Sequence, residues 1–502
     1  MHMIKQENFM KKEVIKPPLL VSEVYAVETM PSILGTYDLT ATYLMIVFYI
    51  TNATTAVTGG VSAFTYWLLG GITFFLPSVI VTAQLGVMLP YEGSLYNWTH
   101  KAFGGFWSFF SAFCAWFPAI LVMISAGDVI VSFLQGLNKD WLTSPIQQGA
   151  VIAVVLLFSG MIATQRFRVV QNIINVVIVL TFCAVALIGL ASISWLIQGH
   201  ASATSFSHLA DWSINWQPGT GNVNVFGLVT LAYLGVEGPL NMAGELKDRQ
   251  AIRKHLVWGT ILVFAGYFIA TFALLAVMGP EQASATPFSL ISTVDKGLGK
   301  VAGNIAAICL MSFFLMSIAV YSYTYSRLPF VAAIDQRLPA FMGKLNKHRI
   351  PSRAIWLQTI FAVVVTFLVF IGVPLIANTA DTTTIVYNVL LASSTLVWAF
   401  STLFLFVDVA IFYFRDKAGF RHHQIFPLPL LGICCVLGSL SCILAIIDSL
   451  FYSWIVNLLD NLHWLYAIGG VTFVCIIIAT IGSMLASSEA LWEGMINRET
   501  KV

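Results

Sequence analysis

Charged side chains are scarce in this sequence. Of its 502 residues, 10% are Asp, Glu, Lys or Arg, whereas 58% are hydrophobic. The charged share is less than half of that in a typical soluble domain, and no charged residue lies between Asp38 and Glu92. That interval has room for two membrane-spanning helices of about 20 residues each. The composition therefore excludes an ordinary soluble fold and predicts an all-α polytopic membrane protein.

Motifs for enzymatic chemistry are also missing. The sequence contains no nucleotide-binding loop, metalloprotease helix or nucleophile elbow. Its seven cysteines all lie in apolar runs without the spacing of a zinc site or a disulfide framework. A net charge of +2 gives no reason to expect a nucleic-acid partner. We therefore expect no cofactor, no metal and no enzymatic activity; a membrane-embedded enzyme is the disfavoured alternative.

Long apolar runs divide the chain. Residues 1–38 are polar, lack the features of a cleavable signal peptide, and are expected to form a cytoplasmic tail. Residues 39–414 form a ten-helix core, 415–486 two further helices and 487–502 a second cytoplasmic tail. The apolar runs predict twelve spans at 39–57, 63–88, 105–135, 146–164, 169–198, 223–245, 255–278, 301–326, 354–377, 383–414, 427–450 and 463–486.

The distribution of basic residues predicts the orientation. With both termini inside, 22 of the 25 Lys and Arg residues fall on the cytoplasmic side, and Lys139, Lys296 and Lys300 remain outside. This bias follows the positive-inside rule, and inverting the topology would reverse it. We therefore expect a multi-pass protein of a bacterial inner membrane, in contact with the lipid bilayer.

The sixth predicted span contains residues that interrupt a helix. Gly235, Glu237, Gly238 and Pro239 lie within five positions of an otherwise apolar segment. Glycine and proline weaken the helical ladder, and backbone freed at membrane depth is tolerated only where protein or a watery cavity receives it. The pattern predicts a broken helix at a functional site.

The first predicted span contains a second candidate break. Residues 49–55 read Tyr-Ile-Thr-Asn-Ala-Thr-Thr, and these Asn and Thr side chains compete with the backbone for hydrogen bonds. Transporters built from inverted repeats place interrupted helices at corresponding positions of the two repeats. We therefore expect a five-plus-five inverted repeat with helices 1 and 6 broken.

Three segments carry a resemblance to a known family. Residues 90–104, 233–239 and 326–340 contain Pro-Tyr-Glu-Gly-Ser-Leu-Tyr-Asn-Trp-Thr-His, Tyr-Leu-Gly-Val-Glu-Gly-Pro and Ser-Arg-Leu-Pro-Phe-Val-Ala-Ala-Ile-Asp. Together they resemble the amino acid/polyamine/organocation superfamily of permeases, over roughly residues 35 to 490. Because the first helix lacks the usual Gly-Ser-Gly signature, the chain is most similar to the bacterial glutamate/GABA antiporter branch.

The resemblance implies a substrate site built mainly from backbone. The substrate carboxylate would dock on amides of helix 1 and its ammonium on carbonyls of helix 6, which fits the partial charges of interrupted helices. By position in the motifs, the site residues are Ile50, Asn52, Ala53, Thr54, Met123, Leu231, Tyr233, Leu234, Gly235 and Tyr321. Thr181 stands where some proton-coupled relatives carry a lysine, which argues against coupling through that position.

Two carboxylates have alternative interpretations. Glu237 is either a proton acceptor or, as we favour, a brace that holds the broken helix by accepting hydrogen bonds from loop amides. Asp128 either selects a cationic substrate or takes part in protonation, or is a structural residue near the interface; an intramembrane acid is by default a functional candidate.

The resulting prediction is a secondary active amino acid transporter that works by alternating access. Glutamate/GABA-like exchange is the favoured mode. The alternatives are exchange of cationic amino acids or polyamines and proton-coupled symport. The substrate, the coupling ion and the oligomeric state stay open, with a homodimer among the options.

Overall fold

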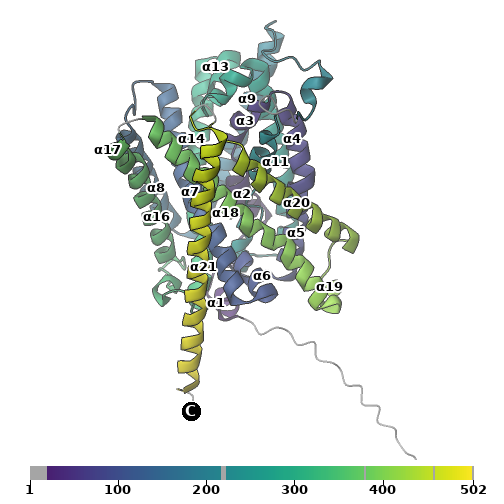
Figure 1. Ribbon diagram of the computed structural model, residues 1–502, viewed down its shortest axis with the longest axis vertical. Helices are drawn as coiled ribbons and strands as arrows, with labels where there is room; N and C mark the ends of the chain where they lie inside the picture. Colours follow the sequence, from purple (N-terminus) through teal and green to yellow (C-terminus); the bar gives the residue numbers. More distant parts are fainter. Residues whose placement is uncertain (1–19, 216–221, 378–379, 456–457, 500–502) are drawn as a thin grey trace, which may run out of the picture.

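The computed structural model describes residues 20–215, 222–377, 380–455 and 458–499. Within these ranges all regular structure is helical (Figure 1). Two isolated β-bridges, Leu34 with Leu246 and Glu92 with Met242, are the only extended pairings there. The all-α prediction therefore holds for the described part of the chain.

The first half of the chain contains the following helices: α1 (Val21–Thr29), α2 (Thr36–Val47), α3 (Asn52–Ala56), η1 (Val57–Gly59), α4 (Ser62–Gly70), η2 (Gly71–Phe75), α5 (Leu76–Met88), α6 (Ser94–Phe103), α7 (Gly105–Leu137), α8 (Pro145–Ala163), α9 (Phe167–Ile197), η3 (Leu209–Trp212), α10 (Asn224–Leu231), η4 (Gly238–Asn241) and η5 (Ala243–Glu245).

The second half continues with α11 (Gln250–Val277), α12 (Pro280–Ser284), α13 (Ser289–Leu298), α14 (Lys300–Tyr325), α15 (Arg327–Ile334), η6 (Ala340–Gly343), α16 (Ser352–Phe367), η7 (Leu368–Gly372), α17 (Val373–Ala377), α18 (Ala380–Arg415), α19 (Lys417–His422), α20 (Leu428–Phe451) and α21 (Asn461–Glu499).

Ten helical segments in the described residues are long and apolar enough to cross a membrane. They correspond to ten of the twelve predicted spans, all except the first and the sixth. The first is a pair of helices, α2 with α3 and η1, bent by 42°. The sixth consists of the eight-residue α10 followed by short turns. The structure therefore supports ten spans, or eleven if the bent pair counts as one.

Burial separates the central helices from the outer ones. Every residue of α2 from Asp38 to Val47 is buried, as is every residue of α14 from Met316 to Tyr325. The outer helices keep one apolar face exposed, as Val176 of α9 and Val436 of α20 illustrate with exposed fractions of 60% and 63%. A helix that is apolar and buried all round belongs in a core. The broken first segment therefore lies at the centre of the bundle.

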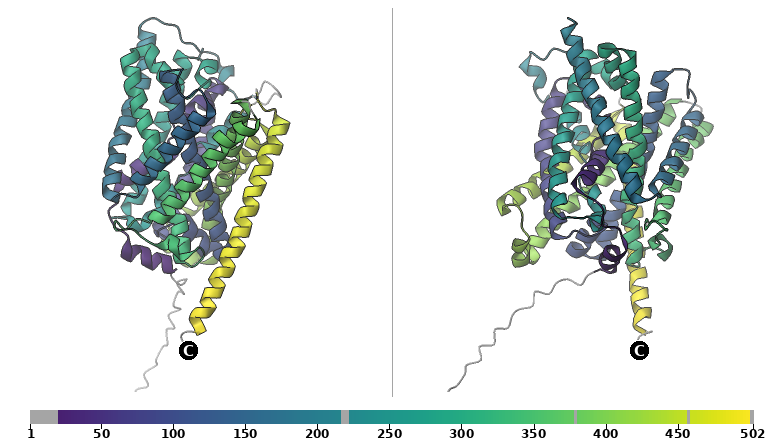
Figure 2. Two further views of the ribbon diagram at one scale, coloured as in Figure 1. Left: turned by 90° about the vertical axis from the view of Figure 1, so that its left-hand side faces the viewer. Right: turned by 180° about the vertical axis from the view of Figure 1, so that it is seen from behind.

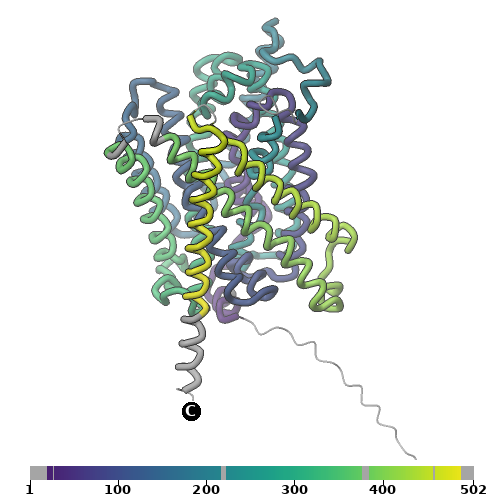
Figure 3. The backbone as a smooth tube through the Cα atoms, in the orientation of Figure 1, coloured from purple at the N-terminus to yellow at the C-terminus, as the bar shows by residue number. Residues whose placement is uncertain are grey.

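The two ends of the bundle carry different elements. In Figure 1, α13 lies at one end and α1, α6 and α19 lie at the other; we call these ends the α13 side and the α1 side. Figure 2 shows α1 beneath the bundle and α21 running along its outside. The α21 backbone stays helical to Glu499, beyond the predicted end of the last span. Figure 3 traces the same arrangement as a tube, with the yellow part of α21 running lengthwise along the bundle. Residues 1–19 of the predicted N-terminal tail and 500–502 lie outside the described ranges.

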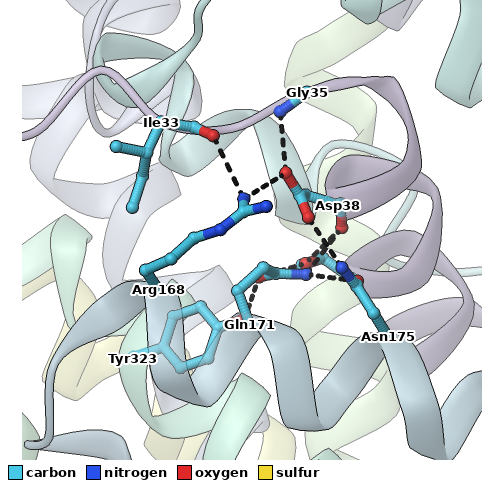
Figure 4. A network of polar contacts seen from close by, with 8 residues as sticks. Ile33, Gly35, Asp38, Arg168, Gln171, Asn175 and Tyr323 are labelled. Carbon is cyan, nitrogen blue, oxygen red and sulfur yellow. Dashed lines mark hydrogen bonds and ion pairs between the residues drawn. The ribbon is translucent and has the colours of Figure 1, made fainter.

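A polar network fixes the start of α2 against α9 (Figure 4). Asp38 accepts hydrogen bonds from Arg168 at 3.0 Å and from Asn175 at 2.7 Å, and its backbone carbonyl accepts one from Gln171. The hydroxyl of Tyr323, on α14, donates to Gln171. Because these groups satisfy one another, the acidic end of α2 is held where the helix can lead into its break.

Candidate functional site

The break after α2 frees three carbonyl groups, and hydroxyls from neighbouring helices satisfy them. Ser317 and Tyr321 of α14 donate to the carbonyls of Met45 and Ile46 at 2.9 and 2.8 Å. The hydroxyl of Tyr267, on α11, donates to the carbonyl of Val47 at 3.1 Å. These contacts stabilise an interruption that would otherwise leave buried acceptors unpaired.

The helix resumes at Asn52, so four residues, 48–51, form the interruption. This interruption overlaps the predicted polar run, 49–55, and begins one residue before it. The amides of the next residues bond locally, from Asn52 to the carbonyl of Tyr49 and from Ala53 to that of Ile50. No backbone bond is found in the described residues for the amides of Ile50 and Thr51. The two amides without a backbone partner therefore lie in the interruption itself, just before α3.

In the sixth segment α10 ends at Leu231, before the glycines that predicted its break. Gly235 has a φ of +95°, a conformation that favours glycine. A Cβ atom placed there would lie 2.7 Å from Ile46 of α2 and 3.2 Å from the Trp398 ring of α18. The glycine therefore lets the unwound backbone lie directly against the end of α2.

Tyr267 links the two breaks. Besides Val47, its hydroxyl lies 3.5 Å from the carbonyl of Ala232 at the end of α10, and it accepts a hydrogen bond from the Asn52 side chain at 3.3 Å. Its ring stacks on Trp67 with a centroid distance of 4.2 Å. One side chain therefore contacts both halves of the first segment and the end of α10.

A cavity of about 880 Å³ lies against both breaks. From the first segment it is lined by Ile46, Val47, Tyr49 and Thr51, and from the sixth by Leu231, Ala232 and Leu234. Further lining residues come from α7, α14 and α18 and from connections on the α13 side, including Thr143, Pro287 and Ser453. The cavity therefore extends from the breaks toward the α13 side.

The predicted site residues divide into two groups. Asp128 and five of the ten predicted substrate contacts line the cavity, namely Asn52, Thr54, Leu231, Leu234 and Tyr321. Six other residues lie outside the lining: Ile50, Ala53, Met123, Tyr233, Gly235 and Glu237. Ile50, Ala53 and Gly235 are positions where the resemblance assigns a role to the backbone, and they adjoin lining residues in the chain.

Tyr233 and Met123 pack away from the cavity. The Tyr233 hydroxyl donates to the carbonyl of Trp67 at 3.2 Å, and its ring stacks on Phe75 at 4.4 Å. The Met123 sulfur accepts hydrogen bonds from Ser322 and Gln358. Both side chains are fully buried. In this conformation they hold neighbouring helices together, and the aromatic wall of the cavity comes from Tyr49, Tyr321, Tyr387 and Trp398.

Glu237 is buried behind residues that line the cavity. Its carboxylate accepts a hydrogen bond from the Trp398 indole at 3.1 Å, and the side chain is 2% exposed. Trp398 itself lines the cavity. This contact joins the unwound part of the sixth segment to α18, which is what a brace requires.

Ionisable groups are rare in the cavity. Among the described lining residues Asp128 is the one carboxylate, and none is Lys, Arg or His. Asp128 lies on α7 beside Ser125 and Val129, and Tyr387 of α18 lies close to it. Most of the remaining polar lining consists of Ser, Thr, Asn and Gln side chains.

The α1 side of the bundle is closed by a buried ion cluster. Arg327 of α15 contacts Glu92 at 3.3 Å and Glu245 at 2.7 Å, and all three side chains are at most 1% exposed. Arg327 also donates to the carbonyl of Tyr323, and Glu92 accepts from the amide of Gly244. Burial raises the pKa of Glu92, the charge of Glu245 acts in the same direction, and Arg327 opposes both.

The N-terminal segment crosses this cluster. The amides of Ile33 and Leu34 donate to the carbonyl of Glu245, each at 3.0 Å. In α1, Glu23 pairs with Lys101 of α6 at 3.0 Å, and Ser22 bonds to Asp335 through both its amide and its hydroxyl. Residues 20–34 of the predicted N-terminal tail therefore pack against the α1 side of the bundle.

Tyr267, Ser317 and Trp398 are among the residues of the site that were absent from the sequence prediction. Each is a polar or amphipathic side chain in an apolar helix, a pattern too frequent in this sequence to single them out. Ser317 lies four residues before Tyr321 and therefore on the same helix face. That spacing is the one signal that could have found it.

Comparison with known proteins identifies the family. The amino acid permease family model matches residues 34–473. A glutamate/gamma-aminobutyrate antiporter of Lactococcus lactis subsp. cremoris is 27% identical over 364 residues, which cover 67% of this chain and 69% of that protein.

Two further relatives carry other transporter names. A probable agmatine/putrescine antiporter of Lactococcus lactis subsp. lactis is 24% identical over 67% of this chain and 71% of its own length. A serine/threonine exchanger of Bacillus subtilis is 23% identical over 74% of this chain and 80% of its own length. The match and the apolar helices make this chain a multi-pass membrane transporter, not an enzyme. It belongs to the amino acid permease family, as its three sequence segments predicted.

Proposed function

We propose that this protein exchanges amino acids across the membrane by alternating access. The observation that carries the proposal is the cavity between two helix interruptions, which reaches the α13 side while the α1 side is closed by the Arg327 cluster. A transporter needs a central site that is accessible from one side at a time. The observed conformation combines a central cavity with a bundle that is closed on the α1 side.

The proposed docking mode uses the backbone at both breaks. The amides of Ile50 and Thr51, which have no backbone partner among the described residues, would donate to the substrate carboxylate. The carbonyls that follow Leu231 face an ammonium group. An amino acid carries both groups on its α-carbon, so the two breaks together match the part that all amino acids share. This explains how one scaffold accepts different side chains.

The proposed orientation places the α1 side in the cytoplasm. Support comes from the excess of Lys and Arg predicted on that side. The cavity would then be open to the outside of a bacterial inner membrane. The two breaks would be equivalent elements of a five-plus-five inverted repeat, with α20 and α21 added after it.

The proposed exchange mode draws on the relatives. Those named above are antiporters or exchangers for amino acids or amines, which favours exchange of one solute for another over uptake driven by a nucleotide. Glutamate/GABA-like exchange is the specific mode that the resemblance predicts, and it stays a prediction.

Counterflow in proteoliposomes tests the proposal. Vesicles containing the purified protein are loaded with unlabelled amino acids or amines, and entry of a trace of the same labelled compound is followed. Exchange predicts transient accumulation that depends on the internal solute. If no compound of a broad panel is trans-stimulated while protein insertion is verified, the exchange proposal is wrong.

A further inference from the structure

Asp128 differs from the other carboxylates buried among the helices. Glu237 accepts a hydrogen bond from Trp398, Asp408 from Thr99 at 2.9 Å, and Asp448 from the amide of Gly227 at 2.8 Å. Asp38 is paired with Arg168. Within the described ranges no hydrogen bond or ion pair to Asp128 is found. Unlike these acids, Asp128 has neither a hydrogen-bond donor nor a cation from the described part of the protein.

An uncompensated carboxylate at membrane depth is costly, and the cost falls when a cation pairs with it. Asp128 is partly exposed and lines the cavity, so a bound solute can reach it. The described lining contains no Lys, Arg or His that could serve instead. The same lack of basic residues leaves the distal part of the cavity without a side-chain partner for an acidic group.

The position of Asp128 along α7 sets the length of the solute. The carbonyl of Val122, on the same helix, accepts a hydrogen bond from Tyr49 at the first break. Asp128 follows Val122 by six residues, which at about 1.5 Å per residue is a rise of roughly 9 Å. Asp128 therefore lies beyond the level at which the first segment contacts α7, and only a solute with an extended side chain would reach it from the breaks.

We propose that Asp128 forms a subsite for the distal cationic group of the substrate, so that the cavity selects amino acids with a basic side chain. The inference rests on the proposed transport function and narrows its substrate class. The α-amino and carboxylate groups dock at the two breaks, and the distal ammonium or guanidinium lies between Asp128 and Tyr387. Ser125 and Asn388 supply further polar contacts around it.

A diamine shares the distal ammonium but lacks the carboxylate. Backbone amides at the first break would then have no partner, so a diamine should bind more weakly than the corresponding amino acid. Comparing the two compounds separates recognition at Asp128 from recognition at the breaks.

The test measures binding and counterflow of L-ornithine, putrescine, L-glutamate and L-serine with the wild-type protein and three variants. Asp128→Asn removes the charge, Asp128→Glu keeps it, and Asp140→Asn neutralises an exposed acid outside the cavity lining as a matched control. We expect the wild type to bind ornithine best. Asp128→Asn should weaken ornithine binding by roughly 10- to 100-fold, as for loss of one charge-assisted hydrogen bond.

Asp128→Glu should recover part of the affinity, the control should match the wild type, and serine binding should change less than threefold or so, since serine does not reach Asp128. The thermal midpoint of each variant establishes that it is folded. Preference of the wild type for glutamate, or unchanged ornithine binding in Asp128→Asn, would overturn the inference.

Failure of the inference can be told from failure of the proposed function. Exchange of serine or glutamate, together with ornithine binding that is insensitive to Asp128→Asn, leaves the transporter proposal standing and removes the cationic subsite. Asp128-dependent binding of ornithine without any trans-stimulation supports the subsite and contradicts exchange.

Discussion

At the α1 side, Glu92 and Glu245 share the guanidinium of Arg327 inside a closed cluster, whereas in the cavity Asp128 has no cation among the described residues. Both regions bury carboxylates in a bundle with few charges. The two regions differ in whether the protein itself supplies a cation to pair with the carboxylate. Where the protein supplies it, the charges hold helices together; where it does not, the position is left for a solute.

The hydrogen bonds at the helix breaks show the same contrast. The carbonyls at the end of α2 are satisfied by hydroxyls of Ser317, Tyr321 and Tyr267. The amides of Ile50 and Thr51 lack a backbone partner in the described residues. Acceptors are therefore satisfied by the protein and donors are left free, a polarity that suits a carboxylate ligand.

The largest expected effect comes from breaking the paired cluster. Arg327→Met leaves two buried carboxylates without their cation, and removal of one partner from a buried ion pair costs about 3–5 kcal/mol. We expect a strongly lowered thermal midpoint in detergent and loss of transport. Arg421→Met, at an exposed position of α19, should leave both unchanged.

A triple variant, Arg327→Met with Glu92→Gln and Glu245→Gln, sharpens the interpretation. It removes all three charges together, so most of the stability should return. If the triple variant were no more stable than Arg327→Met, the ion pairs of Arg327 would not account for the stability of the α1 side.

The next effect concerns the brace at Glu237. Trp398→Phe keeps an aromatic ring but removes the N–H that donates to Glu237, leaving a buried carboxylate unpaired at a cost of about 1–3 kcal/mol. We expect a roughly tenfold lower transport rate at every pH, and Glu237→Gln should abolish transport. Trp107→Phe, on an exposed ring, is the control. If Glu237→Gln instead retained transport at a rate that no longer varied with pH, the proton-acceptor interpretation would be favoured.

A smaller effect is expected at the link between the breaks. Tyr267→Phe removes the hydroxyl that donates to Val47 and accepts from Asn52, so two groups lose a partner. We expect about a tenfold higher KM, corresponding to about 1.4 kcal/mol, with a modest change in thermal midpoint. Tyr25→Phe in α1 should behave as the wild type. An unchanged KM would show that the breaks keep their geometry without this link.

The smallest effect is a pH dependence on the α1 side. Burial, with Arg337 and Lys101 nearby, lowers the pKa of His100 from 6.5 to about 4. The unfolded chain therefore binds more protons than the folded one between these values, and stability from this group is lost as pH falls from about 6.5 toward 4. His100→Gln should reduce the drop in thermal midpoint between pH 7 and pH 5. An equal drop in both proteins would assign it to other groups.

Several features of the fold could be predicted from local sequence. The apolar runs place ten spans close to where the structure has them, because each must be about 20 residues long to cross the membrane. The polar run at 49–55 and the glycines at 235 and 238 indicate where helices are interrupted, because these residue types disfavour a continuous helix. The resemblance of three segments correctly predicted the family.

Other features depend on contacts between residues far apart in the chain. Sequence could not show that Tyr233 packs on Phe75 while Trp398 lines the cavity, since both are aromatic residues in apolar segments. Nor could it show that residues 20–34 pack on the α1 side, because that depends on partners such as Asp335 and Glu245.

The sequence by itself determined that the chain is a helical membrane protein with two weakened spans, because span length and helix-breaking residues are local properties. Tertiary structure alone decided which buried charges are paired. Arg327 lies 235 residues from Glu92 yet meets it, whereas Asp128 meets a cavity. Pairing depends on where helices bring their side chains together, and that is a property of the packed bundle.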